Sequence, residues 1–366
     1  MLDKNKKIKV SVLGATGMVG QRFLTLLNNH PWFEVIDIAA SKNSENKSYH
    51  EAVKNKWALN EPIPEFTKKL ILRHVEDFEK IPKQVRIVFS AVDLLQKKDT
   101  RNFEFQYAKY GYALISTSSA NRKIKRVPMI IPEINHEHLK IIKEQQKYYK
   151  LPKNGFVCVK PNCSIQSYIF VLDALKKANY PIKKIQVTTL QALSGAGYKG
   201  LQNKNLKENV IPYIKNEEEK TEIEALKIFG SIKKGSIVNS TKIKISATCT
   251  RVPIIDGHTA IVNISFKNKI PSIKKFKKIL ASYTSLPQTL KLPSAPLKPI
   301  HLINDIDRPQ PKLDVNLDKG MTLSIGRIQK DTFFDIRFVG LSHNTLRGAA
   351  GGAILNAELL VKENYI

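Results

Sequence analysis

Cysteine is scarce in this sequence, and long apolar runs are lacking. The chain has 3 cysteines, Cys158, Cys163 and Cys249, with no Cys-x-x-Cys pair among them. An odd, sparse set argues against a disulfide framework and for a reducing compartment, so we expect a cytoplasmic protein. No apolar run reaches the ~20 residues that cross a bilayer, so no membrane-spanning helix is expected. The apolar stretch near the start is too short for a secretory signal peptide.

Metal-ligand patterns and acidic residues are also in short supply. The sequence has no His-Glu-x-x-His motif and no Cys/His cluster, and we interpret His136 and His138 in "NHEHLK" as solvated, so no metal site is expected. Acidic residues number 32 against 60 basic ones, giving a net charge of +28, and 49 of the basic residues are dispersed lysines. Without a zinc-finger, RNP-type or basic-heptad motif, this charge favours a solvated lysine-rich surface over specific nucleic-acid binding.

Strand and helix patterns divide the chain into two parts. Its 366 residues exceed the size at which one hydrophobic core usually keeps growing, which predicts two domains. In the first part, apolar strands such as "IKVSVL" and "VRIVFSAV" alternate with helical stretches, as in a doubly wound parallel sheet of the Rossmann type. From about residue 182 the strands are longer and alternate in polarity, which predicts an α+β domain with a mixed, mostly antiparallel sheet. We place the first domain at 1–162, completed by a C-terminal helix at 344–366, and the second at 163–343.

A glycine turn follows the first predicted strand. Gly14, Gly17 and Gly20 in "GATGMVG" lie between that strand and a helical stripe. Glycines at this spacing permit a tight turn and let backbone N–H groups approach a diphosphate, whose charge the helix N-terminus favours. We therefore predict a dinucleotide site at this turn. Its predicted members are Gly14, Thr16, Gly17, Met18, Val19 and Gly20.

The end of the second strand indicates which dinucleotide is bound. Proteins that bind NAD often carry an acid there, which accepts a hydrogen bond from the ribose 2′-hydroxyl. This strand ends instead in "AASKNS", where Ser41, Lys42 and Ser44 offer hydroxyl and ammonium donors. Such donors suit a 2′-phosphate, so the expected cofactor is NADP.

Cys163 opens another helical pattern. It follows Pro161 and Asn162 and precedes "SIQSYIFVLDALKKANY". A thiol in the first turn of a helix faces the positive end of the helix dipole, which lowers its pKa and raises the thiolate fraction. Taken alone, Cys163 fits a reactive thiolate and a structural cysteine equally well, and we interpret Cys158 and Cys249 as structural.

Several motifs together carry a family resemblance. In order and at their separations, they resemble aspartate-semialdehyde dehydrogenase of the archaeal and fungal branch: "GATGMVGQRF", "KPNCS", "QALSGAGYKG", "IPYIKNEEEK", "RVPIIDGHT" and "HNTLRGAAGG". The resemblance runs from about residue 8 to the C-terminus. It implies NADP-dependent reductive dephosphorylation of aspartyl 4-phosphate to aspartate 4-semialdehyde and phosphate, in the biosynthesis of lysine, threonine, methionine and isoleucine. It also implies a homodimer or homotetramer built through the second domain, with the active site between the domains.

The resemblance also implies a role for each motif residue. Cys163 is the implied nucleophile, which forms a thioester, while Gln191 orients the acyl intermediate and His258 is the acid–base group. The implied substrate and phosphate contacts are Arg251, which holds the α-carboxylate, Glu217, Lys220, Arg122 and Asn162. Further cofactor contacts are implied at Ser194, Gly195, Gly197 and Asn344. By their spacing alone, Glu217 and Lys220 are equally explained as a surface ion pair on one helix face.

Two departures and three alternatives accompany the resemblance. The chain reads "SAVDLLQ" where the family usually has a proline after the strand, and "SIQ" where threonine and small residues often follow the cysteine. Malonyl-CoA reductase shares the fold and is similar over "LPSAPLKPI" and "RGAAGGAILNAELLV", but it lacks the "PNC" and "NEEEK" motifs. A nucleic-acid-binding, dehydrogenase-like protein is the alternative from another class, and N-acetyl-glutamyl-phosphate reductase has different active-site motifs. The intact motifs favour aspartate-semialdehyde dehydrogenase.

Overall fold

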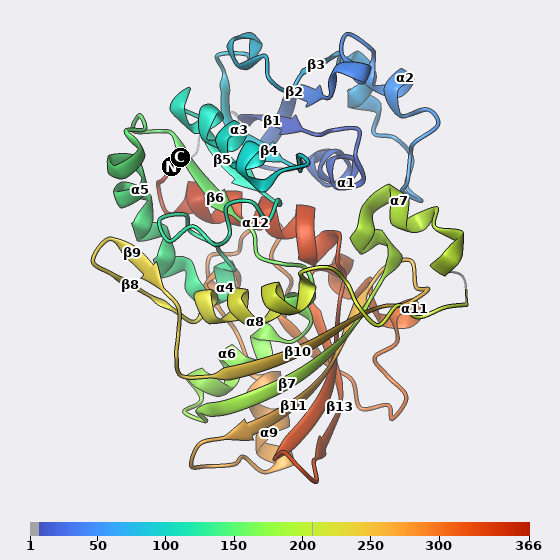
Figure 1. Ribbon diagram of the computed structural model, residues 1–366, viewed down its shortest axis with the longest axis vertical. Coiled ribbons are helices and arrows are strands. Elements are labelled where there is room, and N and C mark those ends of the chain that lie inside the picture. Colours follow the sequence, from blue (N-terminus) through green and yellow to red (C-terminus); the bar gives the residue numbers. More distant parts are fainter. Residues whose placement is uncertain (1–6, 207) are drawn as a thin grey trace.

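Two six-stranded sheets lie one above the other in Figure 1, in a computed structural model that describes residues 7–206 and 208–366. The upper sheet is parallel throughout, in the order β3-β2-β1-β4-β5-β6. Its strands are β1 Ile8–Leu13, β2 Phe33–Ala40, β3 Leu72–His74, β4 Val85–Ser90, β5 Ala113–Ser116 and β6 Phe156–Val159. This strand order is that of a dinucleotide-binding sheet, and it confirms the predicted Rossmann-type fold.

Both faces of this sheet are covered, which explains why its strands are apolar without alternation. On β4, Ile87 and Phe89 pack in one buried cluster with Phe23 of α1, whereas Val88 between them packs in another with Phe103 of α3. The helices of this part of the chain are α1 Met18–Leu27, α2 Tyr49–Val53, α3 Lys97–Lys109, α4 Pro132–Asn135, α5 Ile142–Tyr149 and the C-terminal α12 Gly351–Lys362, which contacts α1 and β5.

The lower sheet is mixed, in the order β10-β7-β11-β14-β13-β12. The three central pairings are antiparallel, whereas β10 with β7 and β12 with β13 are parallel. Its strands are β7 Ile182–Gln191, β10 Lys244–Arg251, β11 His258–Phe266, β12 Ile300–Leu302, β13 Leu323–Lys330 and β14 Ile336–Ser342. The prediction of a mixed, mostly antiparallel sheet is confirmed.

Helices cover one face of the lower sheet. Buried residues such as Val187 and Val262 join Phe170 of α6 and Phe276 of α9 in one cluster. The opposite face carries Ile261, which is 41% exposed. The remaining elements are α6 Ile169–Lys177, α7 Gly197–Leu201, α8 Glu217–Ile228, α9 Ile273–Ala281, α10 Leu286–Thr289, α11 Pro311–Asp314 and the hairpin strands β8 Ser231–Lys233 and β9 Ser236–Val238.

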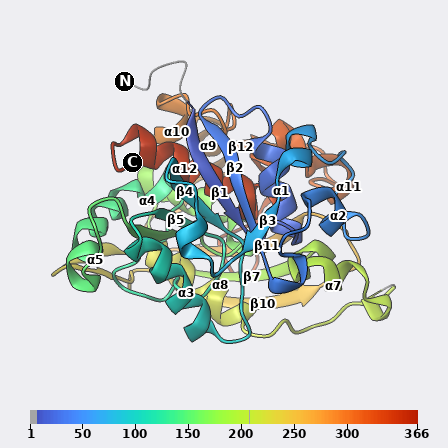
Figure 2. The same cartoon turned by 90° about the horizontal axis from the view of Figure 1, so that it is seen from above.

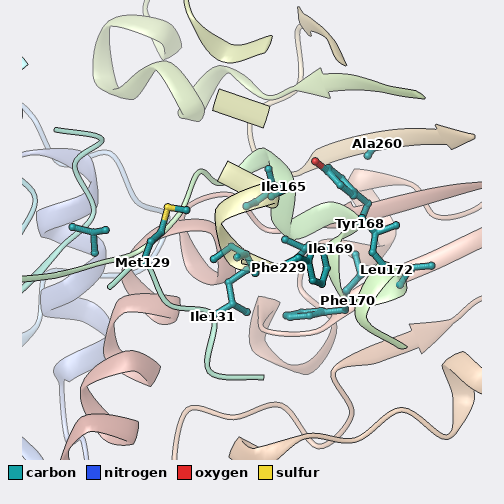
Figure 3. Packing of buried hydrophobic residues seen from close by; sticks show 14 of the residues in the cluster. Met129, Ile131, Ile165, Tyr168, Ile169, Phe170, Leu172, Phe229 and Ala260 are labelled. Carbon is teal, nitrogen blue, oxygen red and sulfur yellow. The ribbon is translucent and has the colours of Figure 1, made fainter. Parts of the chain in front are cut away.

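One hydrophobic core joins the two sheets. The cluster that contains Val88 of the upper sheet also contains Val187 of the lower one. Figure 3 shows part of this cluster, with Met129 and Ile131 on one side and Ile169, Phe170 and Leu172 of α6 on the other. Seen from above in Figure 2, the upper sheet crosses over α7, α8 and the lower strands. The polar residues between the sheets are therefore held by a continuous packed interior.

The structure corrects some local predictions. The helix expected directly after Cys163 is instead a short 3₁₀ turn, Ser164–Ser167, and α6 begins only at Ile169. A π-helical segment, Leu346–Ala350, precedes α12. His138 is not solvated: it is 4% exposed and its ring nitrogens lie near Asn135 and the carbonyl of Gly230.

Two expected absences concern membrane helices and metals. No helix within residues 7–206 and 208–366 has the length and apolar character needed to cross a membrane. Over those same residues, no group of three or more His, Cys, Asp or Glu side chains is arranged to hold a metal ion.

Candidate active site

A cavity of about 450 Å³ lies where the two sheets meet. Ten of its lining residues were predicted from the sequence: Val19, Arg122, Asn162, Cys163, Ser194, Gly195, Gly197, Glu217, Lys220 and Asn344. It opens at the carboxyl ends of β4 and β5, the edge at which open α/β sheets bind ligands. A cavity of similar size, about 460 Å³, lies beside the β8–β9 hairpin, and none of the predicted site residues lines it.

Cys163, which lines this cavity, lies next to the buried His258, although 95 positions separate the two residues in the sequence. Cys163 lies just before the 3₁₀ turn, and His258 is the first residue of β11. The thiol Sγ is 3.2 Å from Nε2 of His258. On the far side of the ring, Nδ1 accepts a hydrogen bond from the backbone N–H of Ala192 at 3.1 Å.

The ring of His258 is neutral, with its proton on Nε2. Burial first, and the nearby guanidinium of Arg251 second, lower the pKa of His258 to about 3. Because Nδ1 accepts from Ala192, the single proton of the neutral imidazole lies on Nε2 and faces the sulfur. The resting His258 therefore donates a hydrogen bond toward Cys163.

The thiol of Cys163 does not have the low pKa that its position in the sequence suggested. Burial first, and the Glu217 carboxylate second, raise the pKa of Cys163 to about 11 against the opposing charges of Arg122, Lys160 and Arg251. The helix dipole contributes little because a 3₁₀ turn of 4 residues separates the sulfur from α6. The free enzyme thus holds a protonated thiol at neutral pH, and formation of the thiolate depends on the surrounding cations and the donor of His258.

Glycines bring the backbone against these catalytic side chains. A Cβ added at Gly195 would lie 2.7 Å from Nη1 of Arg251 and 2.9 Å from Cε1 of His258. A Cβ at Gly348, in the motif "RGAAGG", would lie 2.7 Å from Cβ of Cys163. Close approach to the site, rather than packing alone, therefore explains two of the motif glycines.

Arg251 ends β10 beneath Gly195. Its Nη1 donates to the carbonyl of Ala192 at 2.6 Å, and its side chain is 7% exposed. Across the described part of the chain, no carboxylate forms an ion pair with it. A buried guanidinium with spare donors suits a ligand carboxylate, which it can bind through two parallel hydrogen bonds.

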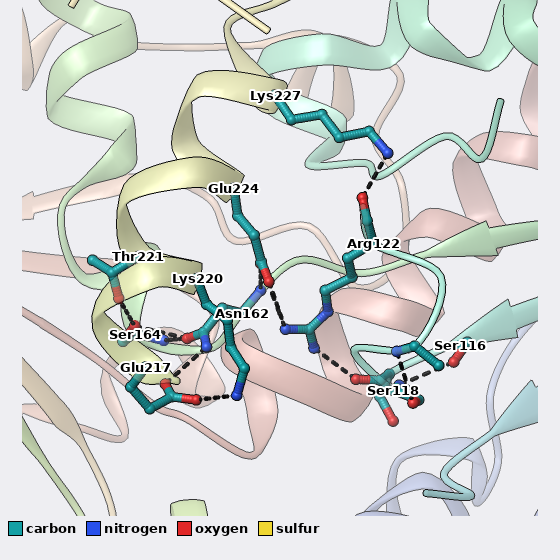
Figure 4. Close-up of polar contacts among 12 residues, drawn as sticks. Ser116, Ser118, Arg122, Asn162, Ser164, Glu217, Lys220, Thr221, Glu224 and Lys227 are labelled. Atoms are coloured by element: carbon teal, nitrogen blue, oxygen red, sulfur yellow. Dashed lines mark hydrogen bonds and ion pairs between the residues drawn. The ribbon is translucent and has the colours of Figure 1, made fainter. Parts of the chain in front are cut away.

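Glu217, the first residue of α8, gathers the polar residues on one wall of the cavity. Its Oε1 accepts from Lys220 Nζ at 2.6 Å, and its Oε2 accepts from Asn162 Nδ2 at 2.8 Å and from Gln191 Nε2 at 3.3 Å. Although burial alone raises the pKa of Glu217, the charge and hydrogen bonds of these neighbours hold it below its usual value. Figure 4 shows this ionised carboxylate between Asn162 and Lys220.

Arg122 lies on the same wall, and Gln191 lies behind it. The guanidinium of Arg122 donates to Glu224 Oε1 at 3.2 Å and to the carbonyl of Thr117 at 2.7 Å. Gln191 ends β7, is 1% exposed and does not line the cavity. The structure thus brings together Arg122, Asn162 and Lys220 as donors around one space, with Gln191 bonded to Glu217.

The glycine turn occupies the carboxyl end of β1. Gly14 has φ +71°, and a Cβ added to it would lie 3.0 Å from the carbonyl oxygen of Ala91. A Cβ at Gly20 would lie 2.1 Å from the oxygen of Gly14, so α1 packs directly on the turn. Gly17 is the N-cap of α1 and provides no side-chain cap. Thr16 and Met18 complete the turn, and of its predicted members only Val19 lines the cavity.

The residues after β2 fit a 2′-phosphate in part. Ser41 and Lys42 are exposed at the carboxyl end of β2, whereas Ser44 is 6% exposed and is turned inward by a short 3₁₀ turn. The acid nearest the end of the strand, Asp37, is buried and engaged by Arg73 through NH···O contacts of 2.9 Å. With no free acid there, these residues fit NADP, and the absence of a side-chain cap on α1 leaves backbone donors for a diphosphate.

Sequence reasoning missed several lining residues. They are Ala91, Val92, Asp93, Thr117, Ser118, Ser119, Ala196, Thr345, Gly348 and Ala349. The departing loop "SAVDLLQ" supplies three of them: its Asp93 accepts from Ser118 at 3.1 Å and from Lys97 at 3.0 Å. Four of them had a sequence signal: Gly348, Ala349 and Thr345 lie within the motif "HNTLRGAAGG", and Ala196 lies within "QALSGAGYKG".

Comparisons with known proteins agree with this geometry. A family model described as semialdehyde dehydrogenase, NAD binding domain, matches residues 9–142, and one described as semialdehyde dehydrogenase, dimerisation domain, matches residues 172–347. The chain is 40% identical to an aspartate-semialdehyde dehydrogenase of Archaeoglobus fulgidus, covering 98% of this chain and 100% of that one. It is 39% identical to an aspartate-semialdehyde dehydrogenase of Aspergillus fumigatus, covering 98% and 99%.

Solved structures show the same relationship. Aspartate-semialdehyde dehydrogenase with NADP from Candida albicans superposes with a TM-score of 0.87 at 36% identity, covering 99% of this chain and 100% of that one. Aspartate-semialdehyde dehydrogenase II complexed with ASA from Vibrio cholerae gives 0.75 at 24% identity, covering 98% and 99%, and is similar in fold. Two curated relatives of nearly equal length and a matching fold lead to one conclusion: the chain belongs to the aspartate-semialdehyde dehydrogenase family.

Proposed function

We propose that this chain is an NADP-dependent aspartate-semialdehyde dehydrogenase, which reduces L-aspartyl 4-phosphate to L-aspartate 4-semialdehyde through a thioester on Cys163. The observation that carries the proposal is the pairing of Cys163 Sγ with His258 Nε2 at 3.2 Å, between two groups of donors. Arg122, Asn162 and Lys220 lie on one side and Arg251 lies beneath Gly195 on the other. Aspartyl phosphate has a reacting carbonyl between a phosphate and an α-carboxylate, which matches this order.

Cys163 is the nucleophile of the first step. Its sulfur attacks the carbonyl carbon, the carbon–oxygen bond to phosphate breaks, and phosphate leaves with that electron pair and with the thiol proton. Arg122, Asn162 and Lys220 hold the departing phosphate, because cationic and amide donors stabilise the charge that gathers on its oxygens.

His258 acts as a hydrogen-bond donor in both halves of the reaction. NADPH, when bound, supplies the hydride that reduces the thioester carbonyl. His258 Nε2–H points into the space beside the sulfur, where negative charge develops on the carbonyl oxygen, and stabilises that oxygen as a preorganised donor. A neutral imidazole suits this role because it keeps its proton at neutral pH. Collapse of the thiohemiacetal alkoxide then breaks the carbon–sulfur bond and releases the aldehyde and the Cys163 thiolate, which takes up a proton from solvent to restore the thiol.

Other residues orient the substrate and the cofactor. Arg251 binds the α-carboxylate, and Glu217 provides the anion that pairs with the α-ammonium group. Gln191 orients the acyl group through its contact with Glu217. The turn at Gly14 and the N-terminus of α1 bind the diphosphate, with Ser41 and Lys42 at the 2′-phosphate. The Candida albicans relative, whose structure was solved with NADP, supports NADP as the cofactor. The full set of cofactor residues is Gly14, Thr16, Gly17, Met18, Val19, Gly20, Ser41, Lys42, Ser44, Ser194, Gly195, Gly197 and Asn344.

The assembly and setting follow the same reasoning. The NADP-binding domain comprises 1–162 and the helix at 344–366, and the catalytic and dimerisation domain comprises 163–343. The protein is a homodimer or homotetramer, which the description of the second family model and the open face around Ile261 support. Its setting is the cytoplasm, and its pathway is the synthesis of amino acids from aspartate. Light scattering of the wild type and of Ile261→Lys tests the assembly. A lysine charge buried in a subunit interface disrupts that interface, so the measured mass of the variant falls.

The test of the function is an absorbance assay. Purified protein with NADP, L-aspartate semialdehyde and phosphate forms NADPH in the reverse reaction, and Cys163→Ala does not. Malonyl-CoA with NADPH is the parallel assay, because malonyl-CoA reductase is the alternative of the same fold. NADPH consumption with malonyl-CoA alone, without phosphate-dependent activity, contradicts the proposal. Retention on a polyanion resin at high salt contradicts it in favour of the nucleic-acid-binding alternative.

A further inference from the structure

One face of α8 contacts every predicted donor of the phosphate site. Glu217, Lys220, Glu224 and Lys227 are three or four positions apart, so their side chains project from the same side of the helix. Figure 4 shows this row facing Asn162 and Arg122. The first two residues line the cavity, whereas Glu224 and Lys227 do not. Glu224 and Lys227 therefore contact the donors from the side that faces away from the cavity.

Glu224 joins two of the donors through one carboxylate. Its Oε1 accepts from Arg122 Nη1 at 3.2 Å, and its Oε2 accepts from the backbone N–H of Asn162 at 2.5 Å. Its side chain is 4% exposed. Buried, charge-assisted hydrogen bonds of this kind fix geometry more firmly than exposed ones. The position of Arg122 is thereby tied to the segment that carries Cys163.

Lys227 holds the segment 122–127, which carries Arg122 at its start. Its Nζ donates to the carbonyls of Arg122, Ile124 and Val127 at 2.7, 2.8 and 2.9 Å. The side chain is 4% exposed, and an ammonium group has three donors, so each has one acceptor. From its other side the segment is held by the N–H of Ile237, which donates to the carbonyl of Lys125 at 2.9 Å.

Apolar packing does not account for this arrangement. A buried cation costs free energy unless its hydrogen bonds are satisfied, and an apolar residue of similar size would fill the space without that cost. Here the three bonds all end on one short segment, and the carboxylate one turn away binds the side chain of the residue at its start. Glu224 and Lys227 therefore both bind the same short segment, residues 122–127.

We propose that Glu224 and Lys227 are positioning residues, which hold Arg122 and Asn162 at the spacing at which they bind phosphate together with Lys220. The inference rests on the proposed function for the identity of the anion. Because Arg251 lies on β10 and has no bond to α8, loss of either positioning residue weakens phosphate binding and leaves binding of the substrate carboxylate in place.

The test compares Glu224→Gln and Lys227→Met with Glu219→Gln. The control removes an exposed carboxylate of the same helix, which pairs with Lys123 of the same segment at 2.6 Å. Exposed pairs contribute little, so the control leaves the KM for phosphate unchanged. In Glu224→Gln and Lys227→Met, the KM for phosphate rises about tenfold while the KM for aspartate semialdehyde stays within about twofold.

Calorimetry with inorganic phosphate separates this inference from the proposed function. If the wild type binds phosphate and both variants bind it about tenfold more weakly, the inference holds even where aspartate semialdehyde is not a substrate. Unchanged phosphate affinity in folded Glu224→Gln overturns it, as does an equal rise in both KM values or in the control. Absence of phosphate binding in the wild type overturns it as well. Should Lys227→Met not fold, Glu224→Gln decides.

Discussion

The two sides of the active-site cavity present different chemical groups to their ligands. The cofactor side relies largely on backbone: Gly14 and Gly17 form a turn in which Thr16 provides the polar side chain, and Gly195 brings the chain against the catalytic pair. The substrate side consists of charged side chains, with Glu217 and Arg122 each bonded to a partner from another element. A dinucleotide diphosphate is recognised by close approach, whereas a small, doubly anionic substrate is recognised by charges at fixed positions.

This difference determines how an amino-acid substitution affects each side of the cavity. On the backbone-built side, a methyl group added at Gly14 or Gly20 meets backbone atoms, which have little room to give way, and one added at Gly195 meets the side chains of Arg251 and His258. On the charged side, the residues support one another, so the loss of one leaves a buried charge without its partner. We expect the largest effect on activity from substitution of Cys163, where the two sides meet. We expect the smallest effect at a buried group whose hydrogen bonds are already formed within the protein.

Cys163→Ser has the largest expected effect. Oxygen replaces the sulfur that forms the thioester, so kcat falls at least about 10³-fold in NADPH formation from aspartate semialdehyde and phosphate. Cys249→Ala is the matched control, since that cysteine is buried on β10 and its Sγ lies 3.6 Å from Thr221 Oγ1. Its kcat stays close to that of the wild type. Equal loss in both variants would point to a structural effect and remove Cys163 from its role.

Gly195→Ala tests the backbone-built side at its closest contact. The added Cβ meets Arg251 Nη1 at 2.7 Å and His258 Cε1 at 2.9 Å, so both side chains must move. A displacement of this size lowers kcat/KM for aspartate semialdehyde about 10²-fold. The KM for NADP changes less, because the methyl group points at the catalytic pair. A rise confined to the KM for NADP would mean that Gly195 serves the cofactor alone.

Sequence patterns predicted what is local. The individual strands of the parallel sheet and the turn at Gly14 each lie within one short stretch, so periodicity and spacing identify them, whereas the donor residues of the motifs were implied only by the family resemblance. The confirmed mixed sheet followed from alternating polarity, but its parallel outer pairs, β10 with β7 and β12 with β13, bring together strands far apart in the sequence.

Tertiary contacts explain what the sequence did not reveal. The predicted low pKa of Cys163 was wrong because burial outweighs the dipole of a helix that begins six residues later. Lys227 in "EALKIFG" looks like any helical lysine, since its three acceptors lie about 100 positions earlier in the chain. His138 was interpreted as solvated although Gly230, distant in sequence, covers it. Only the folded chain reveals these neighbours.

Lys42→Glu tests the choice of NADP on the cofactor side. An acid at the end of β2 repels a 2′-phosphate and accepts from a 2′-hydroxyl, so the KM for NADP rises about tenfold while NAD becomes a better substrate. Lys83→Glu is the matched control. Lys83 is exposed and precedes β4, so it lies at the amino end of the parallel strands, whereas Lys42 lies at the carboxyl end. Steady-state kinetics with both dinucleotides give the answer, and an unchanged ratio of the two KM values counts against the Lys42 contact.

His258 gives the smallest effect near neutral pH and the sharpest check on the charged side. Its pKa is about 3 in the folded chain, below the value near ~6.5 of an unfolded histidine. As pH falls through this window the unfolded chain binds the proton first, so the free energy of unfolding decreases from pH ~6.5 toward ~3 and is unaffected above it. Nitrogen NMR of His258 should show a neutral ring protonated on Nε2 at pH 5, and His258→Gln should reduce the slope of stability against pH. A ring that titrates near pH 6.5, or carries its proton on Nδ1, would instead make His258 a conventional acid–base group and the hydrogen bond from Ala192 a minor contact.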